Sequence, residues 1–144
     1  MFLSIFITLA GFIIGLGAVT VIDLHGFLGR HSHYWTEATI RTHKVTKPLI
    51  WLGTILVLVG HIMLARFGFW GIPDLTVRLL IISALVLNGC FLSFVVSPAL
   101  IKREMNGHAK DLLPQSLQNK IIVSFIISFA GWWGLVYLFA KSLV

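Results

Sequence analysis

The chain alternates between long apolar runs and short polar segments. Four apolar runs are long enough to cross a bilayer, at about residues 2–24, 48–66, 78–101 and 121–140. About 20 helical residues at 1.5 Å each cover the roughly 30 Å of hydrocarbon in a membrane. Because lipid cannot satisfy backbone hydrogen bonds, each run must be helical. The connections are short, so the pattern predicts an all-α fold, with residues 1–144 forming one integral membrane domain, a four-transmembrane-helix up-down bundle.

Small and polar residues inside the apolar runs indicate how the helices contact one another. Gly11 and Gly15 form a small-xxx-small face on the first run, which lets the backbone of another helix approach closely. Asn88 interrupts the third run, and an asparagine at this depth is expected to hydrogen-bond to a neighbouring helix. The glycine face favours close packing on another helix, either within the chain or in a partner protein or homo-oligomer.

The residues around the second run predict where its helix begins and ends. Thr36 and Glu37 resemble a helix start, with the threonine as N-cap and the glutamate in the first turn. Pro48 then marks either a helix start or a kink in a longer helix. Residues 67–74 are rich in aromatic side chains and glycine, so they predict a turn at the level of the lipid headgroups.

Composition is typical of a membrane protein. Hydrophobic residues make up 58% of the chain and charged residues 11%, whereas soluble proteins average about 25% charged. The net charge of +6 comes from Lys and Arg clustered between apolar runs, so the lipid bilayer, not nucleic acid, is the expected partner. The single Cys90 excludes an intramolecular disulfide. Residues 2–22 exceed a signal-peptide core and have no Lys or Arg before them, so we expect a retained helix.

The distribution of basic residues predicts an orientation in the membrane. Segments 25–47 and 102–120 hold eight of the eleven Lys and Arg residues, and the opposite side holds three. The positive-inside rule therefore places both basic segments in the cytoplasm and both termini outside.

Histidines in and beside the first two runs are the leading candidates for chemistry. His43 and His61 are 18 residues apart, so in an unkinked helix their rings share a face about 27 Å apart. His25, just past the first run, is expected at the depth of His43, and this pair would supply two axial ligands to a b-type haem. The simpler alternative is that His25 and His43 are solvated or contact headgroups. His61 is open to a ligand, proton-transfer or buried structural role.

Basic residues at the start of the second run indicate how an acidic group would be held. One interpretation is that porphyrin propionates or a lipid phosphate bind to Arg41, Lys44 and Lys47. The simpler alternative is that these residues only set the orientation of the chain by the positive-inside rule. Trp132 and Trp133 would stack on a porphyrin or, as aromatic residues do more often, pack against glycine-lined neighbours.

A metal site in the first polar segment is a further alternative. Asp23, His25, His31, His33 and His43 offer carboxylate and imidazole ligands for zinc or copper, although their spacing matches no closed structural site. A helix-end ion pair with a nearby Arg or Lys is the better interpretation of Asp23. The sequence contains no Gly-rich phosphate loop, nucleophile elbow or HExxH motif, which argues against nucleotide-binding and hydrolase functions.

Several of these features together resemble the small four-helix membrane proteins of the HemJ/CopD type. They are the glycine-rich first run, Lys47-Pro48 at the start of the second, Gly53 and Gly60 along it, Arg78 opening the third, and Phe94-Val95-Val96-Ser97-Pro98. HemJ proteins are haem-associated protoporphyrinogen oxidases, and CopD proteins are linked to copper handling. The resemblance implies a bacterial inner (plasma) membrane protein with haem b, or alternatively copper, as cofactor. HemJ proteins also place a histidine in the first span, whereas residues 1–24 contain none.

Three hypotheses for function follow from these observations. The first is a b-haem-binding redox protein, a haem-dependent oxidoreductase, with His25, His43 and His61 as metal ligands. The second is a non-catalytic membrane subunit that binds partner helices or lipid through its glycine faces and basic loops. The third is passage of copper or protons along Asp23, His25 and His61.

Overall fold

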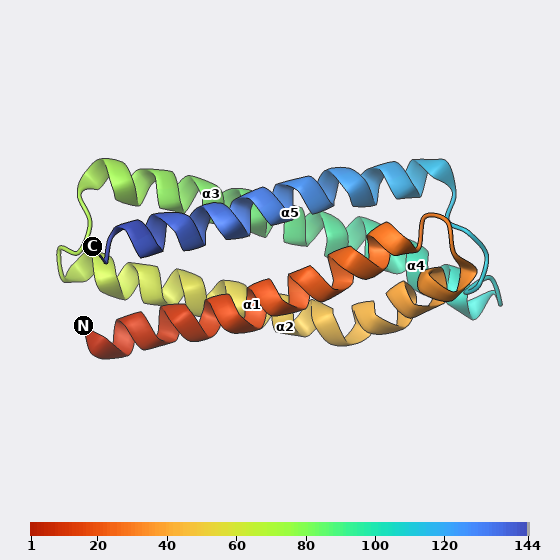
Figure 1. Cartoon of the computed structure of the whole chain (residues 1–144), viewed down its shortest axis with the longest axis horizontal. Helices are drawn as coiled ribbons and strands as arrows, with labels where there is room; N and C mark the ends of the chain where they lie inside the picture. The colour runs from red at the N-terminus through yellow and green to blue at the C-terminus, as the bar shows by residue number, and fades with distance from the viewer. Residues whose placement is uncertain (144) are drawn as a thin grey trace.

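The computed structural model describes residues 1–143, apart from the side chains of Ile72 and Pro73. Every regular element in this part of the chain is helical. The elements are α1 (Phe2–Leu28), α2 (His33–Arg66), α3 (Ile72–Phe91), a π-helix η1 (Leu92–Val96), α4 (Ser97–Met105) and α5 (Gln115–Lys141). Since α3, η1 and α4 follow one another without a break, the chain forms four long rods (Figure 1). The predicted all-α bundle of four transmembrane helices is confirmed.

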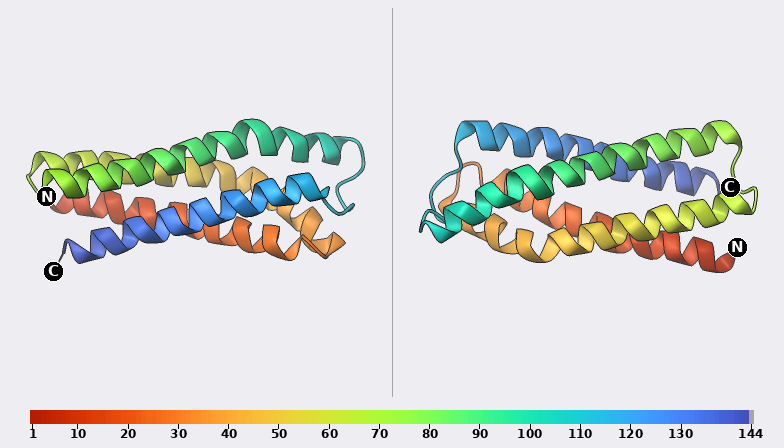
Figure 2. Two further views of the ribbon diagram at one scale, coloured as in Figure 1. Left: turned by 90° about the horizontal axis from the view of Figure 1, so that it is seen from above. Right: turned by 180° about the vertical axis from the view of Figure 1, so that it is seen from behind.

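The connections between the rods divide the bundle into two ends (Figures 1 and 2). One end holds the N-terminus, the C-terminus and the turn 67–71, and we name it the terminal end. The opposite end holds the turn 29–32 and the segment 106–114. We name it the basic end, because segments 25–47 and 102–120, which meet there, hold eight of the eleven Lys and Arg residues.

Each rod is longer than the apolar run that predicted it. The stretches that are long and apolar enough to span a membrane are Phe2–Leu28, His33–Arg66, Asp74–Met105 and Gln115–Lys141. They contain 27 to 34 residues, which at 1.5 Å per residue gives about 40–51 Å, against roughly 30 Å of hydrocarbon. The largest excess is at the basic end of α2, which begins at His33 and not near residue 48.

The start of α2 differs from the prediction. Ser32 is the N-cap, and its side chain accepts a hydrogen bond from the backbone N–H of Trp35 at 3.4 Å. Thr36, predicted as the N-cap, lies inside the helix, where its Oγ1 is 2.8 Å from Gly29 O and 3.0 Å from Ser32 O. Both residue types cap helices, so only the contact with the end of α1 distinguishes them. Pro48 lies inside α2 and therefore does not begin a helix.

Glycines hold α1 and α2 together along a close seam. A Cβ atom added to Gly53 would lie 2.4 Å from the Cα of Gly15 and 2.9 Å from the O of Gly11. A Cβ atom on Gly60 would lie 2.1 Å from Thr8 Oγ1. Real Cβ atoms cannot approach other atoms this closely, so the two backbones are in direct contact. The predicted packing role of the Gly11 and Gly15 face is confirmed, and α2 of the same chain covers that face.

Polar contacts join α3 to α5. Asn88 Nδ2 donates to Ser124 O at 3.1 Å and to Ser128 Oγ at 2.8 Å. Ser124 Oγ in turn donates to Asn88 Oδ1 at 2.8 Å. The predicted hydrogen bond from Asn88 to a neighbouring helix is therefore confirmed.

Two apolar clusters fill the interior. The larger lies in the terminal half and includes Trp132, which is 2% exposed and packs against Gly15, where an added Cβ would lie 2.3 Å from the indole ring. Of the two interpretations of Trp132, the structure shows packing against a glycine-lined neighbour. The smaller cluster, at the basic end, consists of Ile40, Val96, Leu100 and Leu113.

Large apolar side chains also cover the outside of the bundle. Among them are Phe2 at 82% exposed, Ile13 at 75%, Leu87 at 71% and Phe94 at 77%. Apolar surface of this extent is unfavourable in water and suits the acyl chains of a bilayer. The lipid bilayer is thus a partner that the structure supports.

Candidate functional site

The structure brings ionisable side chains from two helices to one void inside the bundle. Asp23 comes from α1, and His43 and Lys47 come from one face of α2, as the i, i+4 spacing requires. Trp51 and Ser93 also line the void. Its volume is about 60 Å³, which is room for a few water molecules, because one water needs roughly 10–15 Å³ of such space. We name this site the Asp23–His43 cavity.

Two polar atoms in the Asp23–His43 cavity are buried without a hydrogen-bond partner in the protein. They are Asp23 Oδ2 and His43 Nε2. Lys47 is engaged differently, since its Nζ donates to Ser93 O at 3.5 Å. Buried polar atoms are almost always hydrogen-bonded to protein or to water. The carboxylate and the imidazole are therefore the two groups that can interact with water or a ligand in this void.

The wall opposite α2 is formed by the π-helix η1. Ser93 is within η1, and its O accepts from Lys47 while its Oγ accepts from Trp51 Nε1 at 3.0 Å. π-Helices are rare and occur mostly as single turns, frequently at functional sites. No sequence pattern predicted the π-helix.

Asp23 also borders two neighbouring voids. One, of about 30 Å³, is lined by Thr54, Asn88 and Trp132. The other, of about 130 Å³, lies between α1 and α5 and is lined by Arg30 as well as by apolar residues. Asp23 is thus the residue common to all three voids. No acidic side chain other than Asp23 lines them in the described part of the chain.

His25 and His43, which were predicted as a pair of haem ligands, have different neighbours in the structure. His25 Nδ1 forms a hydrogen bond with Thr42 Oγ1 at 3.1 Å, and its ring lies 5.1 Å from that of Trp35. His43 follows Thr42 in α2, so it points about 100° away from that contact, toward the Asp23–His43 cavity. His25 does not line this cavity.

The three basic residues predicted to receive an acidic group are separated in the structure. Arg41 Nη2 lies 2.6 Å from Glu37 Oε1, and Lys44 Nζ lies 2.8 Å from Glu104 Oε2. Carboxylates of the chain itself therefore neutralise these two side chains. Lys47 is the one of the three that lines the cavity.

His61 occupies the terminal end of α2, and its side chain is fully buried. Its Nδ1 lies 2.8 Å from Val57 O, and because a carbonyl only accepts, Nδ1 carries the proton. The His61 ring stacks on Trp70 with centroids 4.8 Å apart. The Arg78 guanidinium in turn lies 4.4 Å from the centroid of the Trp70 ring.

Trp70 lies in the turn that was predicted at the level of the lipid headgroups, and its side chain is buried. It is 8% exposed and belongs to the larger apolar cluster. The reason is that the indole fills the space between His61 and Arg78. The charged Arg78 at the start of an apolar run was the sequence feature that could have indicated this contact.

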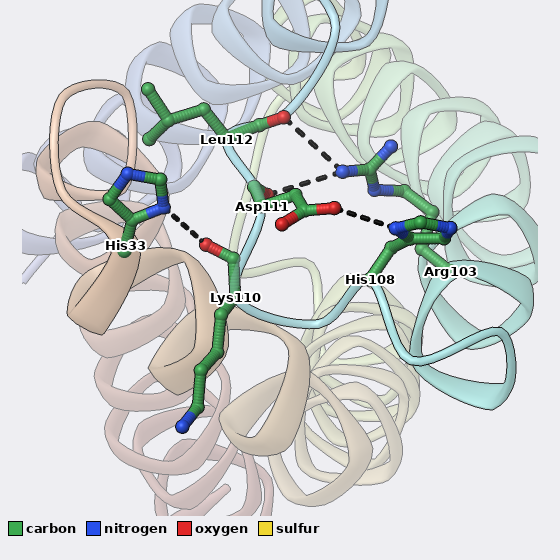
Figure 3. Close-up of polar contacts among 6 residues, drawn as sticks. All are labelled: His33, Arg103, His108, Lys110, Asp111 and Leu112. Atoms are coloured by element: carbon green, nitrogen blue, oxygen red, sulfur yellow. Dashed lines mark hydrogen bonds and ion pairs between the residues drawn. The ribbon is translucent and has the colours of Figure 1, made fainter.

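His33 and His108 form hydrogen bonds with the segment 106–114 at the basic end (Figure 3). His33 Nδ1 donates to Lys110 O at 2.6 Å, and His108 Nδ1 donates to Asp111 Oδ2 at 2.6 Å. Arg103 Nη2 donates to the carbonyl oxygens of Asp111 and Leu112, each at 3.2 Å. Within residues 1–143, no group of three or more His, Cys, Asp or Glu side chains is arranged to hold a metal ion.

Fold and site together define a multi-pass helical membrane protein with an ionisable cavity near its basic end. Comparison of the chain with protein-family models, with curated proteins and with solved structures gives no match. The resemblance to HemJ/CopD proteins stays a prediction.

Proposed function

We propose that this integral membrane protein takes up and releases protons at the Asp23–His43 cavity. The observation that supports the proposal is that Asp23 and His43 line one water-sized void, while Asp23 Oδ2 and His43 Nε2 are buried without a hydrogen-bond partner in the protein. Ionisable residues inside a membrane span are costly, and they mark proton and ion pathways.

The chemistry of the cavity suits proton exchange. Asp23 can hold a proton on Oδ2 and His43 on Nε2, and water in the void can hydrogen-bond to both. Lys47 on α2 is the cationic side chain that lines the same cavity. From the other walls, Ser93 of η1 contributes no charge, and Arg30 of α1 lies on the adjoining void.

The direction of exchange follows from what surrounds the cavity. Toward the terminal end, the void beside Asp23 reaches Trp132, which belongs to the larger apolar cluster. Toward the basic end, Asp23 borders the void of about 130 Å³ that Arg30 also lines, and we propose that protons exchange by this side. By the positive-inside rule we propose that this end faces the cytoplasm and that both termini lie outside. The bacterial inner membrane is the location that the resemblance to HemJ/CopD proteins implies.

Infrared difference spectra of the protein in lipid nanodiscs, recorded between acidic and alkaline pH, test this proposal. We expect the band of a buried carboxylic acid, and its loss in Asp23→Asn. His43→Gln should move the pH midpoint of this band by about one unit, because neighbouring titrating groups interact.

The matched control is Asp111→Asn, which removes a carboxylate that is 60% exposed in the segment 106–114. This variant should leave the band and its midpoint unchanged. A spectrum without an Asp23-dependent band, or a midpoint that does not respond to His43→Gln, would refute proton exchange at this site.

Binding of haem b is the second candidate function. His43 has a buried Nε2 without a partner in the protein, and an axial ligand of haem iron needs such a free nitrogen. The residues fit a haem only in part. The void of about 60 Å³ is far smaller than the roughly 300–1,000 Å³ of typical small-molecule sites. When bound, a haem would supply one-electron chemistry. A Soret band in protein purified after expression with ample haem, lost in His43→Ala, would support this candidate.

A further inference from the structure

The terminal end of the bundle contains a second group of buried polar side chains, which we name the terminal cluster: His61, Trp70 and Arg78. Their exposed fractions are 0%, 8% and 2%. The cluster shares no residue with the Asp23–His43 cavity. A ligand site in the terminal cluster would therefore be separate from the site of the proposed proton exchange.

Hydrogen-bond donors in the terminal cluster have no partner in the protein. These are Trp70 Nε1 and two of the three guanidinium nitrogens of Arg78, Nε and Nη1. His61 Nε2 is also buried and unpaired. The contacts from His61 to Trp70 and from Trp70 to Arg78 bring these three side chains together. Buried donors without an acceptor are rare in native proteins.

The charge of Arg78 is also incompletely compensated. Its Nη2 donates to Leu138 O near the C-terminus of α5, and its guanidinium lies over the Trp70 ring. These contacts supply partial negative charge only. In the described part of the chain, no carboxylate lies within 4.0 Å of the guanidinium. Asp74, one helical turn earlier, is exposed and acts on the guanidinium only from beyond ion-pair distance.

We propose that the terminal cluster binds a small inorganic anion of the halide class. The guanidinium provides the charge, and Arg78 Nε, Arg78 Nη1 and Trp70 Nε1 provide N–H donors of the kind that hold anions in proteins. The site selects for small size, because Phe12 and Phe139 pack on His61 with ring centroids 6.1 and 6.2 Å away. A phosphate or a lipid headgroup is too large for such an enclosed region.

The probe for this site is chloride, compared with gluconate, which is too large to enter. Thermal unfolding of the detergent-solubilised protein is followed while chloride replaces gluconate at constant ionic strength and constant sodium. We expect the unfolding midpoint to rise and then saturate, because a ligand that binds only the folded state stabilises it. General screening cannot produce this difference, since the ionic strength is the same throughout.

Trp70→Phe tests the residue assignment, because it keeps an aromatic ring under Arg78 and removes one N–H donor. We expect it to raise the chloride concentration of half-maximal effect about tenfold, as loss of a hydrogen bond to a charged group does. The matched control is Trp133→Phe, since Trp133 is 48% exposed on α5. Equal midpoints in chloride and gluconate, or equal responses of the two variants, would overturn the proposal.

Discussion

The two histidines of α2 that share a face by sequence spacing have opposite surroundings. At the terminal end, His61 is fully buried, bonded to Val57 O and stacked on Trp70. At the basic end, His43 lines a water-sized void, and its Nε2 has no partner. Both side chains are imidazole rings on the same helix. Their neighbours therefore decide which histidine is fixed in place and which is open to exchange.

The difference comes from what the other helices contribute at each depth. In the terminal half, α1 and α5 supply Phe12, Trp132 and Phe139, and these aromatic rings leave little space. In the basic half, α1 supplies Asp23 and η1 supplies Ser93, and small voids lie between the helices. Periodicity along one helix therefore predicts which residues share a face, but not what that face contacts.

The largest effect is expected at the seam of α1 and α2, which positions both histidines. Gly53→Ala should lower the free energy of unfolding by about 3 kcal/mol, the upper end of overpacking costs, because the new Cβ meets the backbone of Gly15 at 2.4 Å. Chemical or thermal unfolding in detergent measures this loss. Gly17→Ala is the control, since no atom lies within 4 Å of its added Cβ. Equal stability of the two variants would contradict a backbone contact at the seam.

A smaller effect is expected from truncating the histidines, and it tests the comparison directly. His61→Ala should cost about 2 kcal/mol, because it removes the bond to Val57 O and leaves a hole beneath Trp70. His43→Ala should cost about 1 kcal/mol or less, because His43 Nε2 has no partner and the ring already borders a void. Unfolding free energies of the two variants provide the measurement. Similar losses would show that both histidines are structural.

The smallest effect is expected at the surface of the basic end. Lys44→Gln should cost less than about 1 kcal/mol, because its ion pair with Glu104 joins side chains that are 53% and 29% exposed. A double-mutant cycle with Glu104→Gln measures the coupling. A coupling above about 2 kcal/mol would mean that this pair, and not only the glycine seam, holds the basic end together.

The sequence predicted the features that depend on local composition. The four spans follow from apolar length, and the contacts of Asn88 and of the Gly11 and Gly15 face follow from the physics of helices in lipid. The choice between Ser32 and Thr36 as N-cap did not follow, because both residue types cap helices and the contact with Gly29 decides.

The residues of the candidate site were predicted, but the void at which they meet was not. Asp23 and His43 were grouped as possible metal ligands, and Lys47 as a partner for an acidic group. Their meeting at one void depends on how α1 packs on α2 and η1. The burial of Trp70 depends likewise on a long-range contact with His61. Neither arrangement has a periodicity or spacing that could have predicted it.

The π-helix η1 lets its rod hold one more residue without changing which face of α4 points into the bundle. A π-turn widens the helix to take up an extra residue, so the residues after it keep the direction that they would have in an α-helix one residue shorter. If Leu92–Val96 were ordinary α-helix, the extra residue would rotate α4 by about 100°. Arg103 would then leave the carbonyl groups of Asp111 and Leu112 that it now joins.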